Sequence, residues 1–413
     1  RPPPGRHAAR RTTDRRVVTT ALLVDLALAA LLLGAAAWAQ RLVADLRTLP
    51  AVAPAAGTPG GTTSVSLVVP ARDEERTLPV LLRSVAGQLP AVREVVVVDD
   101  ASRDDTAGVA RAGGARVLPA GSPPPGWTGK AWACHTGAAA TTGDLLLFLD
   151  ADTVLRPGAL AGLVAAHATH GGLVSVQPHH DVVRPYEQLS AYFNVVALMA
   201  SAAFTRPGPA REARVPMAFG PCLLTSRDDY LRAGGHDAVR AEILDDAALA
   251  AAYQRAGLPV WCAIGGDAVR MRSYPGGLGQ LVAGWTKNIA SGAADASPSA
   301  TAATVAWISA HHAVAVGALL SLLVGVTGWG GSLVAGSPLL WAVAYVAAAL
   351  QLRWVLRRAG SFRWWAWAIF PVPLLAFDLV FARSLVLTVV RRSVSWRGRE
   401  VALAGDRHGE GVA

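Results

Sequence analysis

The segment Leu145-Leu-Leu-Phe-Leu-Asp-Ala-Asp-Thr153 decides the fold, because five consecutive apolar residues lead directly into two aspartates. A short, continuous apolar run is typical of a strand that is buried on both faces of a parallel sheet. Similar runs occupy residues 65–69 and 95–98, and the intervening stretches at 78–88 and 106–112 predict helices. Strands that alternate with helices predict an α/β domain with a mostly parallel central sheet.

Polar and acidic residues follow each of these strands. Ligands of such sheets bind beyond the carboxyl ends of the strands, so we expect the chemistry at this edge. Asp150 and Asp152 can approach one divalent cation together, and their oxygen atoms suit Mg²⁺ or Mn²⁺ with a diphosphate as a further ligand. An Asp-x-Asp pair is also compatible with a helix N-cap or a solvated turn. The other strand ends supply candidate donor-binding residues: Pro70, Arg72, Asp73, Glu74, Asp99 and Asp100.

The composition indicates a protein that enters a membrane. Of its 413 residues, 52% are hydrophobic and only 16% are charged. The apolar run at 17–39 is long enough to cross a bilayer, and a cleavable signal peptide is the alternative for this run. The segment at 364–390 contains Pro371 and Pro373, which predicts a broken helix or a hairpin. Three apolar segments follow the α/β region, at residues 304–326, 333–350 and 364–390.

These features divide the chain into five parts. Arginines flank the apolar segments and the net charge is +9, a distribution that favours anionic lipid headgroups over nucleic acid. No basic module with interleaved aromatic residues indicates nucleic-acid binding. The expected parts are a basic N-terminus with a membrane anchor helix (1–48), a linker (49–63), the α/β domain (64–296), C-terminal membrane helices (297–392) and a basic tail (393–413).

Motifs along the α/β region resemble the family-2 inverting glycosyltransferases of the GT-A fold. The resemblance rests on Pro70-Ala-Arg-Asp-Glu-Glu75, Val98-Asp-Asp-Ala-Ser-Arg-Asp-Asp-Thr106 and Leu149-Asp-Ala-Asp-Thr153. Further segments are similar to the branch associated with carotenoids and hopanoids: Pro125-Gly-Trp-Thr-Gly-Lys-Ala-Trp-Ala-Cys134, Gln177-Pro-His-His180, Phe219-Gly-Pro-Cys222, Gly234-Gly-His236 and Gly284-Trp-Thr-Lys-Asn288. The resemblance implies a nucleotide-sugar donor, with UDP-glucose favoured, and a membrane lipid or isoprenoid acceptor.

The resemblance also implies roles for donor-side residues. Asp100, together with Asp73 or Glu74, is expected to hold the nucleoside. Asp150 and Asp152 are expected to bind the metal and the diphosphate, and Lys130 is expected to contact a phosphate through its ammonium group. An exposed loop lysine is the alternative for Lys130.

The same resemblance places the general base in Glu242-Ile-Leu-Asp245-Asp246. Asp246 would take the proton from the acceptor hydroxyl as its oxygen attacks the anomeric carbon, and Asp245 can cap the helix that follows. Many family members carry Gln-x-x-Arg-Trp, whereas here Gln280-Leu-Val-Ala-Gly-Trp285 has Gly284 at the arginine position. The residues expected on the acceptor or diphosphate side are Asp245, His180, His236, Trp285 and Lys287, the last in place of the missing arginine.

Three other functions remain open at this point. A polyprenyl-phosphate sugar synthase would share the donor site and differ in its acceptor. A metal-dependent nucleotidyltransferase would need a basic, glycine-rich phosphate loop near the first strand, where residues 70–75 are acidic instead. A membrane scaffold with a decayed transferase domain conflicts with the intact aspartates.

The orientation of the protein rests on the charges of its loops. We expect a multi-pass protein of the cell membrane whose catalytic domain faces the cytoplasm, where nucleotide sugars are found. The uncharged loop near 328–331 and the arginine-rich loop at 353–363 agree with that orientation, whereas the arginines within residues 1–16 favour the opposite one.

Overall fold

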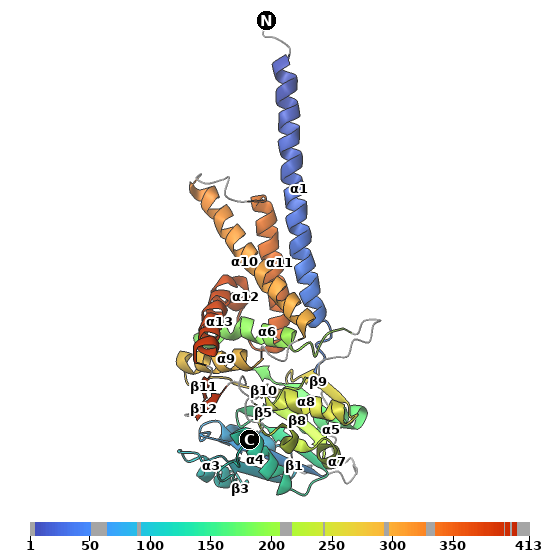
Figure 1. Ribbon diagram of the computed structural model, residues 1–413, viewed down its shortest axis with the longest axis vertical. Helices are drawn as coiled ribbons and strands as arrows, with labels where there is room; N and C mark the ends of the chain where they lie inside the picture. The colour runs from blue at the N-terminus through green and yellow to red at the C-terminus, as the bar shows by residue number, and fades with distance from the viewer. Residues whose placement is uncertain are drawn as a thin grey trace, which may run out of the picture.

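A computed structural model (Figure 1) describes residues 5–50, 64–88, 92–206, 217–242, 244–292, 297–327, 335–391, 393–396 and 399–402. Its central sheet has seven strands in the order β3-β2-β1-β4-β8-β6-β9. Strand β8 runs antiparallel to both of its neighbours, and the other neighbouring pairs are parallel. The expected α/β domain with a mostly parallel sheet is therefore confirmed. The strands are β1 (Val65–Ala71), β2 (Val92–Asp99), β3 (Arg116–Pro119), β4 (Leu145–Leu149), β6 (Leu173–Gln177), β8 (Cys222–Ser226) and β9 (Val260–Ile264).

Alternating residues of β1 pack into two separate cores, one on each face of the sheet. Leu67 and Val69 pack against the helices α2 (Leu78–Ala86), α3 (Thr106–Ala112) and α5 (Ala159–His170). Val68 packs on the opposite face, against α4 (Gly129–Ala139), α7 (Arg227–Arg232) and α8 (Asp245–Arg255). Burial on both faces explains why these strands read as continuous apolar runs.

The register of the sheet brings the polar strand ends together. Ala71 at the end of β1 pairs with Asp99 at the end of β2, and Val68 pairs with Phe148 of β4. A small second sheet has the order β5-β10-β7, and its first strand, β5, directly follows β4 in the chain. Its strands are β5 (Thr153–Leu155), β7 (His179–His180) and β10 (Val269–Met271), and the short 3-10 helices are η1 (Pro185–Ser190) and η2 (Gly235–Val239).

Within the described residues, four helices contain segments that are long and apolar enough to cross a membrane. In Figure 1, α1 and the pair α10–α11 extend away from the sheet domain, whereas α13 lies beside α6 and α9. The helices are α1 (Gly5–Leu42), α10 (Pro298–Thr327), α11 (Pro338–Ala359) and α13 (Pro371–Arg391). Apolar helices therefore occur at both ends of the chain, as expected.

The segment at 364–390 is interrupted at Ile369 and Phe370, in agreement with the expectation of a broken helix or a hairpin. The short helix α12 (Trp364–Ala368) ends before Ile369 and Phe370, and α13 then continues from Pro371 through Pro373. Proline is tolerated in the first turn of a helix because the N–H it lacks would have no intrahelical partner there.

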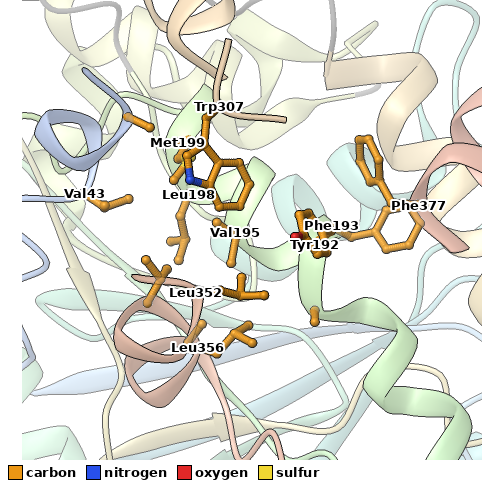
Figure 2. Close-up of a cluster of buried hydrophobic side chains, with 14 of the residues drawn as sticks. Val43, Tyr192, Phe193, Val195, Leu198, Met199, Trp307, Leu352, Leu356 and Phe377 are labelled. Carbon is orange, nitrogen blue, oxygen red and sulfur yellow. The ribbon is translucent and has the colours of Figure 1, made fainter. Parts of the chain in front are cut away.

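Helix α6 (Ala191–Ala200) joins the sheet domain to α1, α10, α11 and α13, which we call the membrane helices for their length and apolar composition. Figure 2 shows Tyr192, Phe193, Val195, Leu198 and Met199 of this helix among side chains from α10, α11 and α13 and near Val43, which follows α1. Helix α9 (Leu278–Gly292) also packs against α13. Helix α6 is almost entirely apolar because the sheet domain and the membrane helices bury most of its surface.

Two short contacts fix the ends of the membrane helices to the sheet domain. Leu49, which we assigned to the linker, is buried in the core of the sheet domain, and its N–H donates to the carbonyl of Ile264 at 2.9 Å. After α11, the N–H of Ser361 donates to the carbonyl of His180 at 2.9 Å. The remaining linker residues 51–63 and the loop near 328–331 lie outside the described residues, and in the basic tail β11 (Ser393–Trp396) pairs with β12 (Arg399–Ala402).

Candidate active site

One continuous cavity of about 1020 Å³ connects the strand ends with the membrane helices. Arg72, Asp100 and Asp150 line it at the edge of the central sheet. Thr304 of α10 and Phe381 of α13 line it among the membrane helices. A ligand can therefore contact the acidic strand ends and the apolar helices at the same time.

The loops after β1 and β2 hold each other in place. Arg72 Nη1 donates to the backbone carbonyl of Asp100 at 3.2 Å and lies 3.4 Å from its Oδ2. Asp73 Oδ1 accepts from the N–H of Arg103 at 2.7 Å, and Asp99 Oδ1 accepts from the N–H of Ser102 at 3.1 Å. Pro70, Arg72, Glu74 and Asp100 line the cavity, whereas Asp73 and Asp99 are engaged within the loops and do not line it.

Asp150 and Asp152 follow β4 and face the cavity together with Lys130. Lys130 stands in the first turn of α4, and its Nζ lies 3.0 Å from Asp150 Oδ1. Burial lowers the pKa of Lys130, but the carboxylates of Asp150 and Asp245 outweigh it and raise that pKa well above its ordinary value. The lysine is therefore a fixed positive charge at the strand end.

The two aspartates fit a divalent cation that takes its other ligands from a substrate. The described residues contain no group of three or more His, Cys, Asp or Glu side chains that could hold a metal by themselves. Mg²⁺ is commonly bound in this way, through one or two carboxylates together with substrate phosphates. Asp150 and Asp152 would be the protein ligands.

Asp246 lies in the first turn of α8, opposite Lys130. Its Oδ2 accepts from the N–H of Gly220 at 2.8 Å. Burial, and next the neighbouring Asp245, raise the pKa of Asp246 to about 6, although Lys130 acts in the opposite direction. A carboxyl group with a pKa in this range can accept a proton near neutral pH.

Gly220 allows the loop after Phe219 to pass close to both charged groups. A Cβ atom at this position would lie 3.1 Å from Asp246 Oδ2 and 3.2 Å from Lys130 Nζ. The motif Phe219-Gly-Pro-Cys222 therefore supplies a backbone N–H to Asp246, a role that the residue types alone did not indicate.

The two histidines expected on the acceptor side have different surroundings. His180 lines the cavity, with its Nε2 3.0 Å from Gln177 Nε2 and its Nδ1 3.2 Å from Ser273 Oγ. His236 does not line this cavity, and its Nδ1 lies 2.9 Å from the hydroxyl of Tyr230. Burial lowers the pKa of each imidazole to about 4, so both are neutral hydrogen-bonding groups near pH 7.

Helix α9 contributes Trp285 and Lys287 to the cavity wall. The Trp285 ring stacks on Phe193 with centroids 4.9 Å apart. Burial, and next the charge of Lys130, lower the pKa of Lys287. The two lysines therefore contribute positive charge to the same region of the cavity.

Tyr274 lines the cavity and was not expected from the sequence. Its backbone has φ 59, and its ring occupies the space beside Gly284, where a Cβ atom would lie 2.1 Å from the ring. A tyrosine in the left-handed region is uncommon and needs support from its surroundings. In the sequence, only Gly284, which stands at the arginine position of the family motif, indicated that a side chain from another segment occupies this space.

The fold and the site together define an enzyme of the α/β class with apolar helices next to its active site. The model of glycosyl transferase family 2 matches residues 66–231. A 4,4'-diaponeurosporenoate glycosyltransferase from Staphylococcus haemolyticus is 33% identical over 347 residues, which cover 83% of this chain and 89% of that protein. The protein of the same name from Staphylococcus aureus is 33% identical over 348 residues, covering 83% and 90%. The chain belongs to glycosyl transferase family 2 and is a glycosyltransferase.

Solved structures are also similar to this chain. A mannosyltransferase from Pyrobaculum calidifontis, in complex with GDP-Man and Mn²⁺, is 20% identical with a TM-score of 0.48, and the match covers 87% of this chain and 98% of that one. A glucosyl-3-phosphoglycerate synthase from Mycobacterium tuberculosis, in complex with Mn²⁺ and UDP, is 24% identical with a TM-score of 0.38, covering 59% and 86%.

Proposed function

We propose that this glycosyltransferase moves a sugar from a nucleotide-sugar donor to a lipid acceptor that reaches the active site from the membrane. The observation that carries the proposal is the single cavity that joins the acidic strand ends to the apolar faces of α10 and α13. A long apolar acceptor gains free energy when its chain is buried against such faces. A carotenoid acceptor is favoured, because the relatives described above are named for a carotenoid acid.

The donor would lie along the edge of the central sheet. Asp100, with its main chain fixed by Arg72, would accept hydrogen bonds from the nucleoside. Asp150 and Asp152 would hold Mg²⁺ or Mn²⁺, and the ion would supply positive charge to the departing diphosphate. Lys130, which is paired with Asp150, places a second positive charge in the same region.

Asp246 would act as the general base. The hydrogen bond from the Gly220 N–H orients the Asp246 carboxylate beside the donor site. The raised pKa makes this carboxylate a stronger base than an ordinary aspartate. It would accept the proton of the acceptor hydroxyl as the acceptor oxygen bonds to the anomeric carbon and the bond to the diphosphate breaks. Attack from the side opposite the leaving group inverts the configuration at that carbon.

The test is release of nucleoside diphosphate by the detergent-solubilised full chain, with Mn²⁺ or Mg²⁺, a panel of nucleotide sugars and a membrane lipid extract. Asp152→Ala and Asp246→Ala are expected to abolish the lipid-dependent turnover. Asp267→Ala is the matched control, since Asp267 is fully exposed and belongs to a surface ion pair. Turnover that persists in both site variants would contradict the assignment.

A further inference from the structure

The membrane end of the cavity is lined by one face of α10. The lining residues follow a spacing of three or four, which places them on a single side of the helix. From Thr301 to His312 the helix rises roughly 16 Å at 1.5 Å per residue. The lining residues of α10 are Thr301, Thr304, Val305, Ile308, Ser309 and His312, and Phe377 and Phe381 of α13 complete the wall.

Two ionisable side chains lie at the far end of this wall. His312 Nε2 of α10 lies 2.8 Å from Asp378 Oδ2 of α13. Their side chains are 41% and 39% exposed, and both line the cavity, so the pair is open to a ligand. Ionisable residues inside membrane-spanning segments are costly and are usually kept for function.

The hydrogen bonds of this pair restrict what it can bind. His312 Nδ1 lies 2.9 Å from the carbonyl oxygen of Ile308 and must donate a proton to it. Nε2 and Asp378 Oδ2 then share one proton, held either by the imidazole or by the carboxyl group. In both arrangements Asp378 Oδ1 can only accept a hydrogen bond, and none from the described residues reaches it.

From this geometry we infer that Asp378, oriented by His312, forms a subsite that recognises a hydroxyl group at the far end of a long apolar acceptor. The inference rests on the proposed function, because it takes the cavity to be the acceptor site. A terminal hydroxyl donates to Oδ1 in either protonation arrangement. A terminal methyl or ketone group offers no proton and would leave the oxygen unpaired, which costs free energy in an apolar site.

A purely structural role would give the pair a different signature. In that case His312 and Asp378 would only connect α10 to α13, as Gln351 connects α11 to α1 and α10 through the carbonyl of Ala36 and the indole of Trp307. Gln351 does not line the cavity. Gln351→Leu is therefore a matched control that removes a polar connection between membrane helices without touching the acceptor wall.

The experiment measures equilibrium binding of three polyene probes to the full-length protein in lipid nanodiscs, through quenching of tryptophan fluorescence. The probes are retinoic acid, 4-hydroxyretinoic acid and 4-oxoretinoic acid, which differ only at the end away from the carboxyl group. Wild type should bind the hydroxy probe about threefold to tenfold more tightly than the other two, as expected for one net hydrogen bond.

The variants separate recognition from folding. Asp378→Leu combined with His312→Leu, which removes both groups that could accept from the hydroxyl, should bind the three probes equally. Asp378→Asn should keep the preference, because its amide group donates to His312 Nε2 and its carbonyl oxygen faces the cavity. Gln351→Leu should also keep it. Equal binding of the three probes by wild type, no binding of any probe, or a preference that survives in the double variant Asp378→Leu with His312→Leu would overturn the inference.

Sugar transfer measured in the same nanodiscs separates this inference from the proposed function. A preference without any turnover of nucleotide sugars would leave the subsite standing and remove the glycosyl-transfer role of the cavity. Turnover of nucleotide sugars without a preference for the hydroxy probe would support the proposed function and remove the subsite.

Discussion

Asp246 has neighbours that act on its carboxyl group in opposite directions. Burial and Asp245 favour the protonated form, whereas Lys130 and the N–H groups of Gly220 and Ala247 favour the carboxylate. The pKa of about 6 is the balance of these effects. A small change in any of them moves the proportion of the basic form near neutral pH.

The pH dependence of turnover follows from this balance. The base form of Asp246 is present above its pKa, so the rate with a hydroxyl acceptor should fall as the pH drops through about 6. Initial rates measured at saturating donor and acceptor check this expectation. Asp246→Asn should lower the rate on the order of a hundredfold or more and remove the step near pH 6. A wild-type rate that does not change across this range would mean that the acceptor attacks as a preformed carboxylate.

Gly220 should be sensitive to a single added methyl group. In Gly220→Ala the new Cβ would press on Asp246 Oδ2 and Lys130 Nζ at 3.1 and 3.2 Å. We expect turnover to fall about tenfold while the thermal unfolding temperature changes little, because both neighbours are ends of side chains and can shift. Gly87→Ala, whose Cβ would meet one backbone oxygen at an ordinary 3.6 Å, is the control. Equal activity in the two variants would contradict the tight fit.

Helices and strands of the sheet domain could be predicted from the sequence where all of their residues are buried. Strand β4 matches the apolar run at 145–149, because burial on both faces makes every residue apolar. The end of an apolar run also located Asp150 and Asp152. The sequence could not separate Asp100, which faces the cavity, from Asp99, which closes the adjacent turn, because both are aspartates at a strand end.

Elements that depend on distant partners could not be predicted. The left-handed backbone of Tyr274 is supported by the hydroxyl of Tyr186, which donates to its carbonyl at 2.9 Å, and by the open side of Gly284. The pairing of His312 with Asp378 joins two helices that are far apart in the chain. No local sequence pattern predicts contacts between residues that are so far apart in the chain.

Helix α9 permits a prediction about Gly284, which stands at the arginine position of the family motif described above. In Gly284→Arg, the new side chain would begin 2.1 Å from the ring of Tyr274. Forcing extra atoms into a packed site costs about 1 to 3 kcal/mol, so the thermal unfolding temperature in detergent should fall. Gly279→Ala on the same helix has open space around its Cβ and should be neutral or slightly stabilising. A stable and active Gly284→Arg would show that Tyr274 is free to move away.

At the scale of the whole molecule, the sheet domain lies at the end of the membrane helices opposite to the C-terminal end of α10 and the N-terminal end of α11 (Figure 1). The arginine-rich end of α11 lies at the sheet domain, where Ser361 bonds to His180. The positive-inside rule then favours a cytoplasmic sheet domain. The arginines near the start of α1 oppose this, since α1 begins at the far end of the molecule in Figure 1.

Labelling of single cysteines on intact cells can decide the orientation. The three native cysteines are buried, so the background reaction should be low. Ala335→Cys lies in the exposed segment before α11, and Asp267→Cys lies on the exposed surface of the sheet domain. We expect a membrane-impermeant maleimide to label Ala335→Cys on intact cells and Asp267→Cys only after permeabilisation. The opposite result would place the sheet domain outside the cell, away from cytoplasmic nucleotide sugars, and would contradict the proposed donor.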